Sequence, residues 1–135
     1  MKQFIDISHE TPKISRMLGK TQAIGVFGEL CAAAFYLLAG YRVLSWRRRF
    51  GRLEADLVVE KGNRRLLVEV KSGFSLKEGR GRPESKLDAP KVKNLAALAR
   101  ILEPKGGGEL SVELLVVDFS KIWPQFRRYP RVCLW

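Results

Sequence analysis

The amino-acid sequence predicts a small α/β protein, with one mixed β-sheet flanked by helices. Two segments carry apolar residues at helical spacing, and four others show strand-like alternation or a short apolar run. Their order along the chain is αβββαβ. The chain has 135 residues, so we expect a single domain, 1–135. The predicted helices cover 21–40 and 89–102, and the predicted strands cover 41–46, 55–60, 65–71 and 110–119.

The helix predicted over 21–40 ends at Gly40, where a glycine commonly stops a helix. One stripe along it consists mostly of small residues, which would allow the helix to lie close against a sheet. Glu29 is the only charged residue inside it. Helix geometry alone fits an exposed glutamate at this position equally well. The preceding residues, 1–20, are polar, and we expect them to form an N-terminal arm or a short helix.

Turns and loops separate the predicted strands. Residues 47–53 are interpreted as a basic turn, and the Lys-Gly-Asn-Arg sequence at 61–64 predicts a hairpin turn. Residues 72–90 combine glycines, prolines and many charges, which predicts a long basic loop. Loops of this length are usually functional or disordered. Residues 120–135 are basic and aromatic and predict a closing hairpin or an edge segment.

The chain is strongly basic, with 25 Lys and Arg against 14 Asp and Glu and a net charge of +11. Clustered positive charge favours binding to the phosphate backbone of a nucleic acid. An acidic membrane surface is the main rival partner, but no long basic amphipathic helix is present. The basic residues cluster at Arg47, Arg48, Arg49 and Arg52; at Lys61, Arg64 and Arg65; and at Lys77, Arg80, Arg82, Lys86, Lys91 and Lys93.

Several functional classes are excluded by composition. The longest uncharged run, 30–41, is shorter than the roughly 20 residues that a membrane helix needs. Two distant cysteines and a single histidine disfavour a disulfide framework, a structural zinc site and histidine-based catalysis. The N-terminus lacks a signal-peptide core. We therefore expect a cytoplasmic protein whose chemistry depends on carboxylates, lysine and a hard metal ion.

The residues that indicate chemistry are Asp56 and the Glu69-Val70-Lys71 segment. Glu69 and Lys71 project to the same face of a strand. A hairpin turn near 62–63 pairs residues whose numbers sum to about 125, which places Asp56 opposite Glu69. Two carboxylates beside a lysine suit Mg²⁺ or Mn²⁺ and a phosphate substrate. Glu29 could supply a third carboxylate. The alternative is a plain cross-strand ion pair on an exposed face.

Four short motifs are spread over residues 25–118. They are Gly28-Glu29 with Ala32, Phe35 and Gly40-Tyr41; Leu53-Glu54-Ala55-Asp56-Leu57-Val58; Val68-Glu69-Val70-Lys71; and Lys91 with Leu95 and Ala99. Together they resemble the PD-(D/E)xK nuclease-like superfamily, and within it the YraN-type family of predicted endonucleases, relatives of archaeal Holliday-junction resolvases. Leu53 stands where the family has glycine, and the arginine-rich segment 46–49 stands where it usually has an asparagine.

The resemblance implies a restriction-endonuclease-like fold and a function. The implied activity is endonucleolytic hydrolysis of phosphodiester bonds in DNA rather than RNA, with branched or structured DNA as the substrate class. The implied metal ligands are Glu29, Asp56, Glu69 and the Val70 carbonyl. Lys71 would be the catalytic lysine, acting with Glu69 and Asp56. Symmetric cutting of both strands would require a homodimer.

The remaining basic residues are candidates for contacts with a nucleic-acid backbone. Arg47, Arg48 and Arg49 could equally protect a sheet edge from aggregation. Glu54 could support the site or pair with Arg52 or Arg65. Two other functions remain open: a non-catalytic nucleic-acid-binding module and a basic adaptor for an acidic protein. The candidate backbone-binding residues are Arg47, Arg48, Arg49, Arg52, Lys91 and Lys93.

Overall fold

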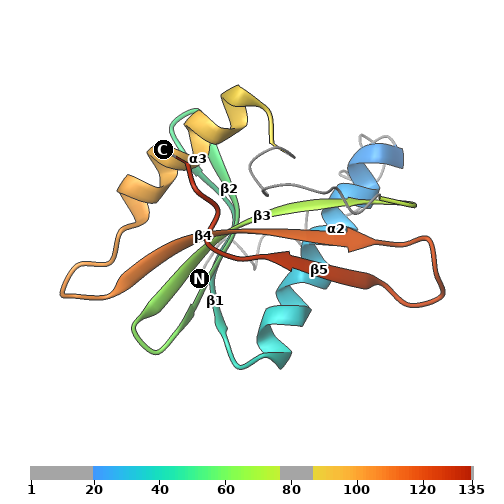
Figure 1. Ribbon diagram of the computed structural model, residues 1–135, viewed down its shortest axis with the longest axis horizontal. Helices are drawn as coiled ribbons and strands as arrows, with labels where there is room; N and C mark the ends of the chain where they lie inside the picture. Colours follow the sequence, from blue (N-terminus) through green and yellow to red (C-terminus); the bar gives the residue numbers. More distant parts are fainter. Residues whose placement is uncertain (1–19, 77–86, 135) are drawn as a thin grey trace, which may run out of the picture.

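The computed structural model describes residues 20–76 and 87–134 (Figure 1). The predicted N-terminal arm and most of the predicted basic loop lie outside these ranges. In chain order the elements are α2 (Lys20–Leu38), β1 (Arg42–Phe50), β2 (Leu53–Lys61), β3 (Arg64–Gly73), α3 (Ala89–Leu102), β4 (Glu109–Asp118) and β5 (Gln125–Tyr129).

The strands form one five-stranded mixed sheet in the order β1-β2-β3-β4-β5. The β3–β4 pair is parallel, with α3 in the connection between them, and the other neighbours are antiparallel. The predicted order αβββαβ is confirmed, and β5 adds the closing hairpin expected within 120–135. Among the described residues, no helix combines the length and hydropathy that a membrane crossing requires.

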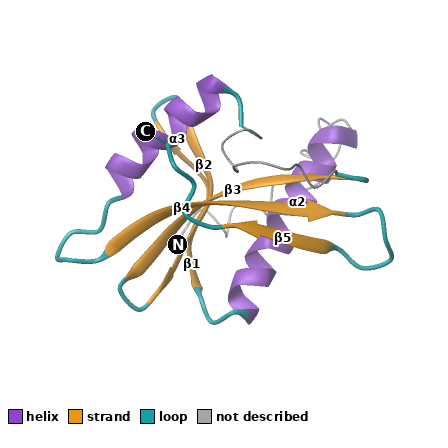
Figure 2. Ribbon diagram, viewed as in Figure 1, coloured by secondary structure: helices purple, strands orange, loops and turns teal. Residues whose placement is uncertain are grey.

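The two helices lie on opposite faces of the sheet (Figure 2). Alternation along each strand directs one set of apolar side chains to α2 and the other to α3. Two buried cores result, each closed by one helix. The core under α2 contains Ala32, Tyr36, Leu57, Val59, Leu66, Val68, Leu115 and Val117. The core under α3 contains Ala55, Val58, Leu67, Leu95, Leu98, Ala99, Val112, Leu114, Val116 and Val132.

Glycines end α2 and turn the β2–β3 hairpin as the sequence predicts. Gly40 has a φ of +91°, and the N–H of Tyr41 returns to the carbonyl of Tyr36 at 2.9 Å, so the helix stops there. Gly62 has a φ of +61° in the hairpin turn. Leu57 pairs with Val68, and the paired residues of β2 and β3 keep one register from there to the turn, in agreement with the predicted sum of 125.

The basic turn predicted over 47–53 is wrong, because β1 continues through it. Arg48 pairs with Ala55 and Arg49 pairs with Glu54, and the chain reverses only at Gly51, whose φ is +65°. Because β1 is an edge strand, its arginine side chains can extend into solvent while the backbone still pairs with β2. Charged side chains on an edge strand also discourage pairing with other chains.

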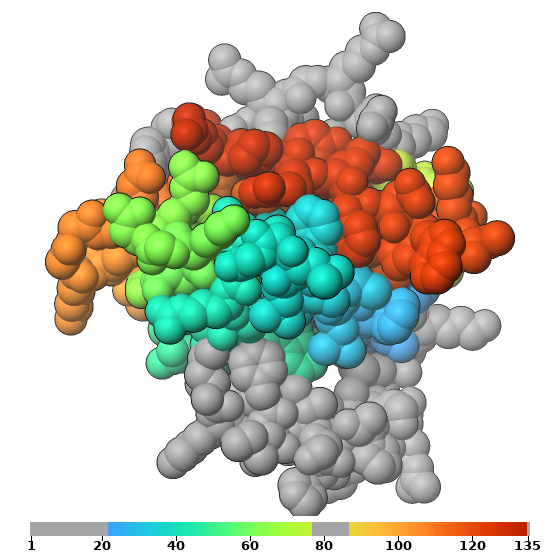
Figure 3. Space-filling model, turned by 90° about the horizontal axis from the view of Figure 1, so that it is seen from below, coloured from blue at the N-terminus to red at the C-terminus, as the bar shows by residue number. Residues whose placement is uncertain are grey.

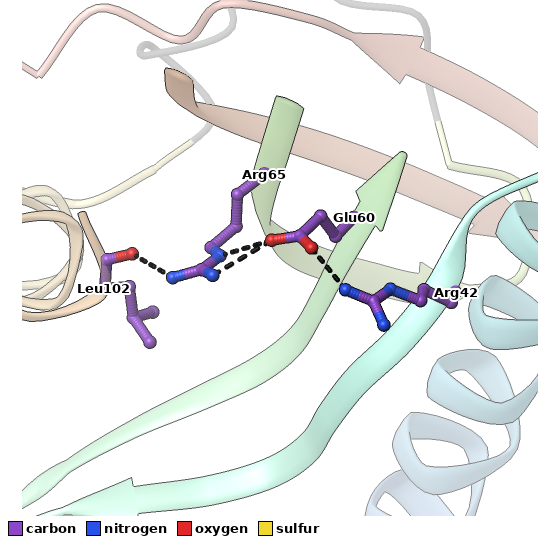
Figure 4. Close-up of polar contacts among 4 residues, drawn as sticks. All are labelled: Arg42, Glu60, Arg65 and Leu102. Atoms are coloured by element: carbon purple, nitrogen blue, oxygen red, sulfur yellow. Dashed lines mark hydrogen bonds and ion pairs between the residues drawn. The ribbon is translucent and has the colours of Figure 1, made fainter. Parts of the chain in front are cut away.

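Glu60 links three strands, and Arg65 extends the link to a helix (Figure 4). Its carboxylate accepts a hydrogen bond from Arg42 at 2.6 Å and two from Arg65 at 3.0 and 2.9 Å. Arg65 also donates at 2.9 Å to the carbonyl of Leu102, the last residue of α3. The hydrogen bonds from Arg42 and Arg65 lower the pKa of Glu60. A guanidinium at the end of a helix satisfies a free carbonyl and complements the helix dipole.

A buried polar network lies between α2, β4 and β5. Glu113 is 1% exposed, and one of its oxygens accepts hydrogen bonds from the Tyr36 hydroxyl and Arg128 Nε, both at 2.5 Å. Its other oxygen accepts from Arg128 Nη2 at 3.0 Å. Burial and Glu113 raise the pKa of Tyr36, and the hydrogen bond to Glu113 raises that of Arg128. The sequence did not predict this network, since 110–119 has the pattern of an apolar strand.

Candidate active site

Asp56 and Glu69 lie next to each other where β2 and β3 stop pairing. The last paired residues on this side are Leu57 and Val68. Beyond this pair, Oδ2 of Asp56 accepts a hydrogen bond from the backbone N–H of Val70 at 3.1 Å. The Asp56 side chain thus replaces the backbone carbonyl that would accept this bond in a continuous ladder. The negative charge of Asp56 acts directly on Glu69. The structure therefore brings together the two carboxyl groups that the predicted register placed opposite each other.

Glu69 is buried, with 7% of its surface exposed. Burial, followed by the negative charge of Asp56, raises the pKa of Glu69 to about 8. A carboxyl group whose pKa lies above 7 keeps its proton at neutral pH. At neutral pH the pair therefore holds a proton that a cation could replace.

Glu29 reaches the site because α2 lies unusually close to β3. A Cβ atom at Gly28 would come within 2.3 Å of the Cβ of Ser72, so only glycine fits here. Ser72 in turn donates a hydrogen bond to the carbonyl of Ile24 at 3.2 Å. Glu29 is 6% exposed, and burial, followed by the charge of Asp56, raises its pKa to about 8. Of the two readings of Glu29 that the sequence left open, the buried one is correct.

Arg47 is held beside these carboxylates by an unusual backbone conformation. Its φ is +52°, a left-handed value that costs about 1–3 kcal/mol in a non-glycine residue and is concentrated at functional sites. Its Nε lies 3.5 Å from Oε1 of Glu29 and 3.5 Å from Oε1 of Glu54. Arg49 also pairs with Glu54, at 3.4 Å. The partners of Glu54 are therefore Arg47 and Arg49, not the predicted Arg52 or Arg65.

Lys91 provides a second cation. Its Nζ lies 3.0 Å from Oε1 of Glu69, and its backbone N–H donates at 2.8 Å to Asp88, the N-cap of α3. Burial lowers the pKa of Lys91, but the charge and hydrogen bond of Glu69 outweigh it, so the pKa is raised. The sequence predicted a phosphate contact for Lys91, and the structure adds a role as counter-ion to Glu69.

The other predicted basic residues lie outside this cluster. Lys71 is exposed, on the same sheet face as Glu69, and none of the ion pairs among the described residues includes it. The side chains of Arg48, Arg49, Arg52 and Lys93 are exposed as well. Arg49 is ion-paired with Glu54, and contacts of all four residues with a nucleic-acid backbone stay a prediction.

The chemistry of Glu29, Asp56 and Glu69 fits a hard divalent cation, because carboxylate oxygens are the ligands that such ions prefer. Oε1 of Glu29 is buried and has no hydrogen-bond partner among the described residues. In residues 20–76 and 87–134, however, no three Asp, Glu, His or Cys side chains are arranged to hold one ion together. The adjacent pair Asp56 and Glu69 is therefore the part of the set best suited to hold a metal. Mg²⁺ commonly uses one or two carboxylates and completes its shell with water and substrate phosphate.

The residues that form this site fall within a region shared with a known protein family. The family described as "Uncharacterised protein family UPF0102" matches residues 28–117, a range that includes Glu29, Asp56, Glu69 and Lys91. The chain belongs to this family. It is the YraN-type family that the sequence motifs resemble, so the predicted membership is confirmed.

Relatives within the family come from distant bacteria. A UPF0102 protein of Symbiobacterium thermophilum is 34% identical over 91 residues, which cover 66% of this chain and 74% of the relative. One from Anaeromyxobacter dehalogenans is 31% identical over 112 residues, covering 81% and 82%. One from Mesorhizobium japonicum is 42% identical over 69 residues, covering 51% of this chain and 54% of the relative. Their names state a family and no activity.

Sequence reasoning missed two features of the site, and only one left a signal. A lysine in the first turn of a helix opposes the helix dipole, which marked Lys91 as unusual but not as a partner of Glu69. Arg47 carried no signal, because its left-handed backbone and its reach to Glu29 depend on how α2 packs over the edge of the sheet.

Proposed function

We propose that this chain is a metal-dependent endonuclease that hydrolyses phosphodiester bonds in DNA. The observation that carries the proposal is the convergence of Glu29, Asp56 and Glu69, two of them buried with a pKa of about 8, in a chain of net charge +11. Pure binding of phosphate gains nothing from buried carboxylates, because they repel the backbone. A cation bound between the carboxylates and the phosphate would remove this repulsion and could take part in hydrolysis.

Asp56 and Glu69 would hold Mg²⁺ or Mn²⁺, with Glu29 as a third carboxylate nearby. When bound, such an ion lowers the pKa of a water ligand and neutralises charge on the phosphate. The hydrogen bond from the Val70 N–H fixes Asp56 for this task. The resemblance also implies that the Val70 carbonyl is a metal ligand, and this role stays a prediction. Lys71 would donate to a phosphate oxygen on which negative charge develops during hydrolysis.

Arg48, Arg49, Arg52 and Lys93 would contact the backbone on either side of the scissile bond. DNA is proposed over RNA, and branched or structured DNA over plain duplex, on the family resemblance alone. A homodimer would let two sites act on two strands. We place the protein in the cytoplasm, where a reducing environment suits the two cysteine side chains, Cys31 and Cys133.

A non-catalytic nucleic-acid-binding module is the second candidate. One observation favours it: Arg47 and Lys91 already lie at 3.5 Å and 3.0 Å from Glu29 and Glu69, so the carboxylates have counter-ions without a metal. In this case Asp56, Glu69 and Lys91 would serve only to hold α3 on the sheet.

Cleavage of a fluorescent panel tests the proposal. Single strand, duplex, flap and four-way junction DNA are incubated with wild type, Glu69→Gln and Lys71→Ala in Mg²⁺, in Mn²⁺ and in EDTA. Lys105→Ala is the control, since Lys105 is exposed in the turn after α3. Metal-dependent cutting that disappears in both site variants and persists in Lys105→Ala supports the nuclease. Binding without cutting under all conditions would favour the second candidate.

A further inference from the structure

Three phenylalanine rings form an exposed aromatic surface at one end of the sheet. Phe27 and Phe119 have ring centroids 5.3 Å apart, and those of Phe74 and Phe119 are 6.2 Å apart. Phe27 is 56% exposed and Phe74 is 60% exposed. We call these three residues the aromatic platform. Large apolar rings held at the surface of a monomer commonly mark a binding site.

The platform rests on a rigid base built around Asp118. This buried carboxylate accepts hydrogen bonds from the backbone N–H groups of Ser75 at 3.1 Å, Leu76 at 3.0 Å and Ser120 at 2.9 Å. Arg127 also donates at 2.6 Å to the carbonyl of Leu76. These bonds fix the two segments that follow β3 and β4, which carry two of the rings. The rings are therefore held in place by the backbone, so little ordering is needed when a partner binds.

The platform lies on the α2 side of the sheet and is separate from the candidate active site. Phe27 contacts Phe119 beyond β4, whereas Glu29 pairs with Arg47 of β1, because residues two apart on a helix point in nearly opposite directions. Phe74 follows Lys71 by three residues, so alternation along β3 directs the two side chains to opposite faces of the sheet. Figure 1 shows the start of α2 and the ends of β3 and β4 gathered at the right-hand end of the sheet. In Figure 3 the first turns of α2, in blue, lie beside the orange-red segment that follows β4.

We propose that the aromatic platform stacks unpaired nucleobases, so that the chain recognises a single-stranded segment of a nucleic acid. Stacking on aromatic rings accepts any base, and it requires bases that are not already stacked in a duplex. The charge of the chain favours this occupant, because +11 attracts a polyanion and repels a second copy of itself. The charge of Asp118 is directed at backbone N–H groups rather than at the surface, since only 6% of the residue is exposed. As a statement about the substrate, the inference rests on the proposed function.

Binding measured in EDTA separates the platform from catalysis. Anisotropy of a fluorescein-labelled oligothymidine and of a labelled duplex is followed at one fixed salt concentration, because both affinities depend on salt. The variant is Phe27→Leu/Phe74→Leu, which keeps the sites apolar and removes the rings. The control is Leu38→Ala, at the far end of α2, where Leu38 is 91% exposed. Stacking is worth about 1–3 kcal/mol per base, so we expect oligothymidine affinity to fall at least about tenfold, with duplex affinity changed less than about twofold.

An equal loss for both ligands, or no loss for oligothymidine, would overturn the inference. So would sedimentation showing that the rings hold a dimer while oligothymidine binding is unchanged. Thermal melting of the variant confirms that it is folded. If wild type binds oligothymidine through the platform but cuts nothing in the panel, only the proposed nuclease fails. If it cuts but the platform variant binds normally, only this inference fails.

Discussion

The side chain of Asp56 accepts a hydrogen bond from the backbone N–H of Val70 at 3.1 Å, at the point where β2 and β3 separate. A backbone N–H that loses its strand partner needs another acceptor when it is not exposed to water. Asp56 supplies that acceptor, and its position beside Glu69 follows directly. The opening between the strands and the pairing of two carboxyl groups are thus one structural feature.

The stability of the protein should fall as the pH rises through neutrality. The pKa of Glu29 and Glu69 rises from the ordinary 4.5 to about 8 on folding. Between these values the native state holds more protons than the unfolded chain, so the free energy of unfolding decreases with pH. Glu29→Gln should weaken this pH dependence. Its free energy of unfolding relative to wild type should increase as the pH rises from 5 to 9. Urea unfolding in EDTA at several pH values measures the free energy of unfolding, and Glu109→Gln, at an exposed position, is the control. An unchanged slope in Glu29→Gln would contradict the assignment.

Removing the cation beside Glu69 should raise the pKa of Glu69 further. Lys91→Met deletes an ammonium 3.0 Å from that carboxylate and keeps the length of the side chain. The charged form of Glu69 then loses its nearest favourable partner, so the carboxyl keeps its proton to a higher pH. NMR titration of the glutamate carboxyl carbons in EDTA follows the change, and Lys93→Met, exposed on the same helix, serves as the comparison. A pKa that stays the same or falls would mean that Lys91 does not neutralise Glu69.

The contact between α2 and β3 should tolerate no side chain at Gly28. Gly28→Ala places a Cβ 2.3 Å from Ser72, so we expect a loss of at least about 1–3 kcal/mol, as for overpacking in a core. Gly25→Ala is the matched control, because nothing lies within 4 Å of its added Cβ, and a helix gains roughly 0.5–1 kcal/mol from alanine. Adding Ser72→Gly to Gly28→Ala should restore part of the stability. Equal effects at both glycines would refute the close approach.

The buried Glu113 network should matter more through Arg128 than through Tyr36. Tyr36→Phe removes one hydrogen bond from Glu113, which costs about 1–3 kcal/mol when it involves a buried charged group. Arg128→Met leaves the Glu113 carboxylate, 1% exposed, without its cation, and breaking such a pair costs about 3–5 kcal/mol. Chemical denaturation of the two variants compares them. The reverse order would show that Arg128 contributes little to holding β5 on the sheet.

The hairpin that carries Asp56 and Glu69 could be predicted from the sequence alone. Its turn at 61–64 lies within a few residues of both strands, and alternation of apolar residues determines which side chains share a face. Leu57 and Val68 therefore pair as the register predicts. The sequence predicts a turn where Arg48 lies, but this residue belongs to the edge strand β1. A run of charged residues resembles a turn when the sheet that supports it is not known.

Only the tertiary structure decided what surrounds these carboxylates. Arg47 meets Glu29, Lys91 meets Glu69 and Phe27 meets Phe119, and each contact joins elements far apart in the chain. Periodicity states which face of an element is apolar, but it does not state which other element covers that face or at what distance. The chain by itself therefore determined its elements, its hairpin register and its carboxylate pair. The counter-ions, the raised pKa values and the aromatic platform depend on burial and on distances that exist only once the helices pack on the sheet.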